Sequence, residues 1–120
     1  MKICITSQGS DLNSEVDSRF GRCAYFIIID TETMDFESIE NPNIHATGGV
    51  GIRSAQFVSN KAVNTVITGN CGPNAFHTLK SANIDVITGA KGKVKNIVEQ
   101  YKSGSLKTDP GPSVSPKFGL

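Results

Sequence analysis

The stretch from residue 62 to residue 76 constrains the fold more than any other part of the sequence. Residues 62–68 are short and rich in β-branched side chains, which is typical of a buried strand. Pro73 suits the first position of a helix, because the N–H that proline lacks would have no partner there. The glycine-containing turn between them carries Cys71. The pattern therefore predicts a strand, a thiol-bearing turn and a helix in direct succession.

This turn is also a candidate binding site. Unbonded backbone N–H groups and the positive end of the helix dipole are expected beside Cys71. That combination favours an anionic ligand with an affinity for sulfur. The alternative is a tight strand-to-helix turn whose cysteine has no function, and this segment alone leaves both interpretations open.

The rest of the sequence predicts four further strands and two further helices. The expected strands are residues 2–7, 23–30, 34–40 and 84–88, and the expected helices besides 73–81 are 52–61 and 92–102. Residues 31–33 are of hairpin length, so the strands on either side should be antiparallel. Residues 1–102 are thus expected to form one domain. Residues 103–120 are rich in proline, glycine and serine without periodicity, which predicts a flexible C-terminal tail.

These elements predict an α/β fold with one mixed five-stranded sheet and helices on both faces. Because crossover connections are right-handed, the first, fourth and fifth strands should be parallel. The expected strand order is 3-2-1-4-5, with the second strand antiparallel to the others. This arrangement is called ribonuclease H-like.

Composition limits the functional classes. With 120 residues, 38% of them hydrophobic, the chain can bury a core without disulfides or a structural metal. A net charge of +1 without a strongly basic block argues against a nucleic-acid partner. No apolar stretch approaches the roughly 18 residues that cross a membrane. Three cysteines, an odd number, behind a start that does not resemble a signal peptide predict reduced thiols in a cytoplasm.

The predicted topology brings separate loops to one edge of the sheet. The first, third, fourth and fifth strands end at this edge, and the antiparallel second strand begins there. Ligands of open α/β sheets favour the point where the strand order reverses. Three helix N-termini should face the same edge with N–H groups suited to an anion. Cys4 lies inside the first strand and is expected in the core. The loops expected to meet are residues 7–9, 22–23, 48–51, 69–72 and 89–92.

Charged and soft side chains near this edge are the candidate ligands. Arg19 and Arg22 could donate hydrogen bonds to sulfides or phosphate, or could be solvated surface charges. Cys23 and Cys71 could bind iron, copper or molybdenum as thiolates, or could be inert. Nearby arginines and helix N-termini would lower their pKa values. His45 could be a third ligand, a proton-dependent switch or an exposed loop residue.

Three motifs follow one another in the expected domain. They are Ser18-Arg-Phe-Gly-Arg-Cys-Ala-Tyr-Phe26, Asn41-Pro-Asn-Ile-His-Ala-Thr-Gly-Gly-Val-Gly-Ile52 and Gly69-Asn-Cys-Gly-Pro-Asn-Ala-Phe76. In this order they resemble the dinitrogenase iron–molybdenum cofactor biosynthesis family, over about residues 1–102. That family groups NifX-type cofactor carriers, the C-terminal part of NifB-type proteins, and the small orange protein that holds a molybdenum–copper sulfide cluster.

The resemblance implies a ribonuclease H-like domain that binds or carries an anionic metal–sulfur cluster, either iron–sulfur or molybdenum-containing, and has no catalytic activity. Its partners would be cofactor-assembly or acceptor proteins, and a role in nitrogen fixation does not follow. The metal-ligand candidates are Cys23, Cys71 and His45. The cofactor-binding candidates are Arg19, Phe20, Gly21, Arg22, Gly48, Gly49, Gly51, Gly69, Asn70, Gly72, Pro73 and Asn74.

Two other functions compete with a cluster carrier. The same glycine loops and arginines could form a regulatory module that binds an anion or a nucleotide without a metal. A nuclease is suggested by the fold class alone. Ribonuclease H-type chemistry needs carboxylates on central strands to hold two metal ions, but the first strand has Ile3, Cys4 and Ile5 there. Asp30 and Asp85 are expected at the opposite edge, so the residues argue against a nuclease.

Overall fold

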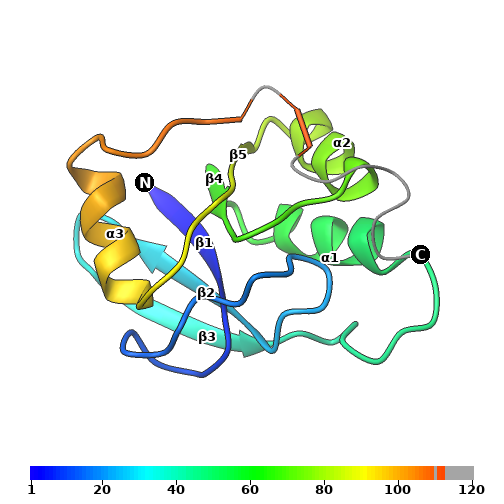
Figure 1. The fold of residues 1–120 in the computed structure, drawn as a ribbon, viewed down its shortest axis with the longest axis horizontal. Coiled ribbons are helices and arrows are strands. Elements are labelled where there is room, and N and C mark those ends of the chain that lie inside the picture. The colour runs from blue at the N-terminus through cyan, green and yellow to red at the C-terminus, as the bar shows by residue number, and fades with distance from the viewer. Residues whose placement is uncertain (110, 113–120) are drawn as a thin grey trace.

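The strands form one mixed sheet, and the helices pack against it (Figure 1). The computed structural model describes residues 1–109, 111 and 112. Within them no helix is long and apolar enough to span a membrane. The strands are β1 (Lys2–Ser7), β2 (Tyr25–Asp30), β3 (Phe36–Glu40), β4 (Thr65–Ile67) and β5 (Asp85–Ile87), and the helices are α1 (Val50–Ser59), α2 (Pro73–Ser81) and α3 (Val94–Lys102).

The predicted bounds of β1 and α2 are confirmed, whereas β2 and β5 are shorter than the predicted 23–30 and 84–88. Four other elements begin elsewhere than predicted for identifiable backbone reasons. Met34 and Ala62 have left-handed φ angles of 64° and 57°, which a strand does not accommodate, so β3 and β4 begin later than predicted. Gly49, with φ 63°, accepts a hydrogen bond from Arg53 N and starts α1 before the predicted residue 52. Gly92, with φ 99°, delays the start of α3.

The strand order β3-β2-β1-β4-β5 matches the prediction. β2 is antiparallel to β1 and β3, whereas β1, β4 and β5 are parallel. Ser7 at the end of β1 pairs with Tyr25 at the start of β2, and Ile67 at the end of β4 pairs with Ile87 at the end of β5. The loops at these ends therefore meet at one edge of the sheet, which we call the C-terminal edge.

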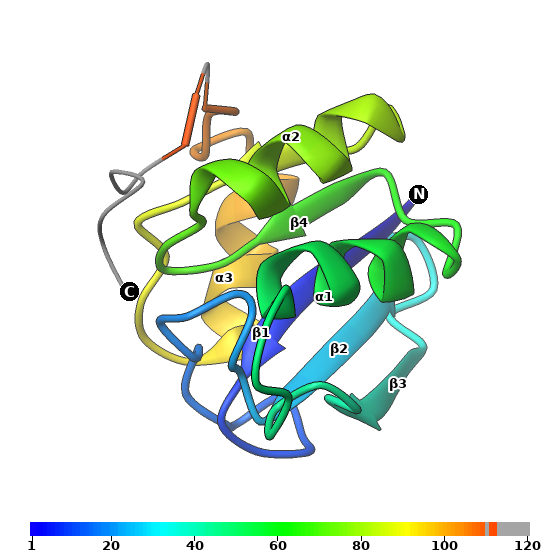
Figure 2. The same cartoon turned by 90° about the vertical axis from the view of Figure 1, so that its right-hand side faces the viewer.

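Helices cover both faces of the sheet. Figure 2 shows α1 and α2 in front of the strands and α3 behind them. One hydrophobic cluster includes Val58 of α1 and Leu79 of α2, and the other includes Ile97 of α3. β1 supplies both, because Cys4 faces the first cluster while Ile3 and Ile5 face the second. Cys4 is fully buried, as predicted.

The first part of the predicted tail contacts the domain. Leu106 packs against the cluster on the α3 face, and Asp109 N donates to Val86 O at 2.8 Å. The sequence did not indicate these contacts, because they depend on a single leucine and a single carboxylate. Residues 110 and 113–120 lie outside the described residues, and flexibility there remains a prediction.

Candidate functional site

The N-termini of α1 and α2 lie side by side at the C-terminal edge. The two helices pack against each other, and a Cβ atom placed on Gly51 would lie 3.4 Å from the Cβ atom of Ala75. Gly21, from the loop before β2, lies equally close to the start of α1, with its Cβ position 3.3 Å from Gly51 Cα. Glycine at positions 21 and 51 permits this approach. Three predicted site segments therefore meet at one place.

Three side chains hold the loop before β2 in position. The Asp17 carboxylate accepts hydrogen bonds from Arg19 N (3.1 Å) and Ala24 N (3.2 Å). The buried Asn41 side chain donates from Nδ2 to Gly21 O (3.1 Å) and to Cys23 O (3.0 Å). Ser54 of α1 also donates to Gly21 O (3.1 Å). None of the predicted site residues is Asp17, Asn41 or Ser54. Their common signal in the sequence is a small polar residue inside or beside a predicted site motif.

The loop after β4 is joined to the same segment. Phe20 N donates to Asn70 O (3.2 Å), and Asn70 Nδ2 donates to Ser18 O (3.2 Å). A Cβ atom on Gly69 would lie 2.7 Å from Ser18 Cα, so only glycine fits there. Phe20 is 2% exposed and its ring lies 5.8 Å from that of Phe26. Phe20 was predicted to bind cofactor, but its observed contacts are with the core.

Three arginines lie exposed around this junction. Arg19 and Arg22 were predicted site residues, and Arg22 Nη1 donates to Ile44 O at 3.2 Å. Arg53 was not predicted; it lies in the first turn of α1, and its Nε would be 3.9 Å from a Cβ atom on Gly49. An arginine in the first turn, where acidic residues are usually favourable, is the signal that could have identified it. Within the described residues the recorded ion pair, Lys80–Asp85, does not involve these arginines.

Two of the three helix N-termini retain donors for an anion. The N-cap residues of α1 and α2 are Gly49 and Gly72, so neither helix has a capping side chain, and neither has an acidic residue in its first turn. The prediction that α3 also offers unsatisfied donors is wrong, because Val94 N and Lys95 N donate to Ser14 O and Leu12 O at 2.9 Å. The loop between β1 and β2 therefore satisfies the N-terminus of α3.

The remaining predicted residues of the two glycine motifs lie around these helix N-termini. Gly48 is exposed, with nothing within 4 Å of its Cβ position. Pro73 occupies the start of α2 as predicted, half-buried, and Asn74 follows it with an exposed side chain. Asn74 thus belongs to the exposed part of the site.

Cys23 and Cys71 lie in one hydrophobic cluster, together with Cys4. They are 0% and 1% exposed, and neither forms a disulfide. The predicted lowering of their pKa values is wrong. Burial raises the pKa of Cys71 to about 12, with a smaller contribution from the negative charge of Asp109. Burial likewise raises the pKa of Cys23, with smaller contributions from Cys4 and Asp17. Both groups are therefore protonated thiols at neutral pH.

The structure does not gather the predicted metal ligands into a metal-ion site. His45 lies exposed on the loop between β3 and α1, whereas Cys23 and Cys71 are buried in the core. Among residues 1–109, 111 and 112, no three His, Cys, Asp or Glu side chains are grouped so that they could hold a metal ion. Ligation of a larger cluster by the two cysteines remains a prediction.

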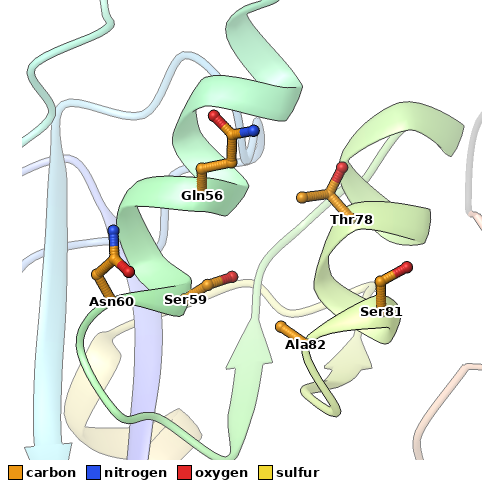
Figure 3. Close-up of a pocket in the computed structure, with 6 residues that line it drawn as sticks. All are labelled: Gln56, Ser59, Asn60, Thr78, Ser81 and Ala82. Carbon is orange, nitrogen blue, oxygen red and sulfur yellow. The ribbon is translucent and has the colours of Figure 1, made fainter.

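A surface groove of about 480 Å³ lies elsewhere, between the C-terminal halves of α1 and α2 (Figure 3). Its hydroxyl groups donate to carbonyls of their own helices: Ser59 to Ala55 O, Thr78 to Asn74 O and Ser81 to His77 O. None of the predicted site residues lines it. The groove is thus separate from the junction at the helix N-termini.

The chain is similar in sequence to known proteins. The family model described as dinitrogenase iron-molybdenum cofactor matches residues 1–104. An uncharacterized protein of Methanocaldococcus jannaschii is 32% identical over 98 residues, which cover 79% of this chain and 83% of that protein.

Solved structures share both fold and sequence with this chain. The apo form of the orange protein from Desulfovibrio gigas has a TM-score of 0.91 and 33% identity, covering 94% of this chain and 96% of the other. A Thermotoga protein described as a candidate NifB protein has a TM-score of 0.77 and 38% identity, with coverage of 89% and 91%.

Proposed function

Because this chain belongs to the dinitrogenase iron-molybdenum cofactor family, we propose that it is a non-catalytic carrier or scaffold for an anionic metal–sulfur cluster. The cluster, iron–sulfur or molybdenum-containing, is its cargo, and the protein holds it for cofactor assembly or for delivery to an acceptor protein. The protein acts in the cytoplasm.

The observation that carries this proposal is the combination of two helix N-termini and exposed arginines at the C-terminal edge. Two uncapped helix N-termini lie side by side there, and their dipoles favour a negative charge next to them. Arg19, Arg22 and Arg53 add three full charges around the same point. An anion bound at this junction would receive backbone N–H and guanidinium hydrogen bonds together.

We assign the first contacts with the cargo to these donors rather than to the thiols. Cys23 and Cys71 are buried and protonated at neutral pH, so ligation by thiolate would require both exposure and loss of a proton. Hydrogen bonds and charge at an exposed surface hold an anion weakly. Weak holding suits a carrier, which must release what it binds.

The second candidate is a regulatory module that binds an anion without a metal. The protonated state of the buried thiols favours it, because such a ligand needs no soft ligand atom. A nuclease of ribonuclease H type is disfavoured by the arrangement of the carboxylates. Asp30 pairs with Lys2 at the start of β1, and Asp85 pairs with Thr65 at the start of β4. Both carboxylates therefore lie away from the C-terminal edge.

The test is anaerobic purification followed by a visible spectrum and analysis of Fe, Mo, Cu and sulfide. A carrier should be coloured as isolated or after incubation with a metal–sulfur anion. Arg53→Gln should weaken uptake, most visibly at low salt. Lys102→Gln, which removes the same charge at the far end of α3, is the matched control.

A Cys23→Ser/Cys71→Ser double variant separates the two modes of holding. Uptake equal to wild type supports holding by charge and hydrogen bonds, and abolished uptake in a folded double variant establishes thiolate ligation instead. A colourless, metal-free protein that takes up no cluster but binds phosphate would establish the regulatory module.

A further inference from the structure

A carboxylate of the chain itself occupies a pair of donors at the C-terminal edge. Asp109 Oδ2 accepts a hydrogen bond from Thr88 N at 2.8 Å and a second, short one from Thr88 Oγ1. The Asp109 backbone N–H donates to Val86 O in β5. Thr88 and Asp109 are both half-buried. Thr88 therefore presents a backbone and a hydroxyl donor to one negatively charged group, as an anion-binding site does.

These donors lie directly next to the cysteine-bearing loop. Gly89 N donates to Gly69 O at 2.8 Å, and Ala90 N donates to Thr68 O at 3.2 Å. Cys71 follows Gly69 by two residues, and the Asp109 charge contributes to the raised pKa of its thiol. The carboxylate thus lies between the β5 side of the sheet and the loop that leads into α2.

The segment that brings the carboxylate there has few other attachments in the described part of the chain. Residues 103–109 follow α3 and run along the β5 side of the molecule toward α2 (Figure 1). Leu106 packs against the α3 face, and residues 103–105 hydrogen-bond to the last turn of α3. We call residues 103–109 the strap. Its end is held by the bonds of Asp109 to Val86 and Thr88.

We propose that the Thr88 donors form an anion subsite of the cargo site and that Asp109 is its intramolecular occupant. An incoming anion and the Asp109 carboxylate would compete for the same two donors and repel each other through their like charges. Binding of cargo therefore releases the end of the strap, and closure of the strap favours release of cargo. This inference rests on the proposed function, because it concerns the ligand of the same site.

The first experiment tests the strap without any cargo. Asp109→Asn keeps the size of the side chain and removes its charge, and Glu99→Gln, an exposed residue of α3, is the matched control. Amide hydrogen exchange of Thr88 and alkylation of Cys71 by iodoacetamide are measured in each protein. We expect the exchange rate of the Thr88 amide to rise about tenfold in Asp109→Asn, through a weaker hydrogen bond. The alkylation rate of Cys71 should rise with it, because the strap is held less firmly beside the thiol, and both rates should stay unchanged in Glu99→Gln. Unchanged rates in both variants would show that the Asp109 carboxylate does not hold the strap at Thr88.

The second experiment measures affinity with tetrathiomolybdate, a soluble metal–sulfur dianion, and separately with inorganic phosphate. Asp109→Asn should bind the anion about tenfold more tightly than wild type, whereas Thr88→Val, which removes the hydroxyl donor, should bind it more weakly. Equal affinity in wild type and Asp109→Asn overturns the competition and leaves the carrier function standing. Tighter binding of phosphate alone supports the subsite and contradicts the carrier function. If neither wild type nor Asp109→Asn binds tetrathiomolybdate or phosphate, both the subsite and the carrier function are overturned.

Discussion

Asn41 connects two loops whose relative position defines the candidate site. Its side chain donates to the carbonyls of Gly21 and Cys23 and accepts a hydrogen bond from Asn43 N, while it is 4% exposed. A carboxamide can donate two hydrogen bonds from its nitrogen and accept another at its oxygen without carrying a charge. A buried polar group with all its partners is favourable, and the same group without them is costly.

Asn41→Asp should therefore destabilise the protein by about 2 kcal/mol or more, because a carboxylate oxygen would face the carbonyls that Nδ2 now contacts. Asn74→Asp is the control, since it makes the same change at an exposed position in the first turn of α2, where a negative charge is favourable. Urea unfolding measures both variants. An unchanged midpoint for Asn41→Asp would show that the loop does not depend on the donor.

The buried thiols give the protein a defined response to alkaline pH. Burial raises the pKa of Cys4 above its ordinary 9.0, so folding favours the protonated thiol. This contribution to stability is fully present below pH 9.0 and is lost as the pH rises toward the folded pKa, because the unfolded chain ionises first. Each such thiol should lower the free energy of unfolding by about 1.4 kcal/mol per pH unit in that range.

Cys4→Ala should make the free energy of unfolding fall less steeply with rising pH, because one titrating thiol is removed. The cavity left by the side chain also lowers stability at every pH. The measurement is the free energy of unfolding of both proteins between about pH 8 and pH 11. Parallel curves for wild type and variant would contradict the raised pKa of Cys4.

Among the secondary-structure elements, α2 shows what local sequence can predict. Its bounds and its position after β4 follow from Pro73 and from the β-branched residues before the turn. The environment of Cys71 could not be predicted in this way. A turn residue in sequence became a core residue, because the loop carrying Phe20 and the helices α1 and α2 enclose it. The N-terminus of α3 also differs from the prediction because of a contact with a distant part of the chain: the loop between β1 and β2 accepts hydrogen bonds from its N–H groups.

Gly69 lies against a neighbouring loop and Gly48 does not, so the same substitution at both positions tests that contact. Gly69→Ala should cost about 1–3 kcal/mol and weaken anion binding, because its Cβ atom would lie 2.7 Å from Ser18 Cα. Gly48→Ala should leave the stability unchanged, since nothing lies within 4 Å of that Cβ position. Thermal unfolding and tetrathiomolybdate titration of both variants provide the measurements. Equal behaviour of the two alanine variants would show that the contact is not needed.

For the molecule as a whole, topology was predictable and the end of the domain was not. The order of strands and helices, with right-handed crossovers, sets which loops meet, and the observed sheet agrees. Residues 103–109 show no periodicity, so their attachment could not be read from the pattern. It depends on Leu106, which packs on the α3 face, and on Asp109, which bonds to Thr88 after β5.

A chain that ends at residue 102 should therefore melt at a lower temperature than one that ends at residue 112. The shorter chain loses the packing of Leu106 and the bonds of Asp109 to β5 and Thr88, for which we expect a fall of about 4–8 °C, or roughly 1 kcal/mol. The longer chain keeps every described residue and serves as the control. Identical melting temperatures would mean that residues 103–112 add nothing to the stability of the domain.

We propose that an anionic metal–sulfur species binds where α1 and α2 begin. The most direct test is an anaerobic titration of the ¹⁵N-labelled protein with tetrathiomolybdate, followed by amide chemical shifts. We expect saturable shifts at Arg19–Arg22, Gly49–Arg53 and Asn70–Ala75, which become smaller as the salt concentration rises. Shifts confined to the groove lined by Gln56, Ser59 and Thr78, or no saturable shifts at all, would contradict it.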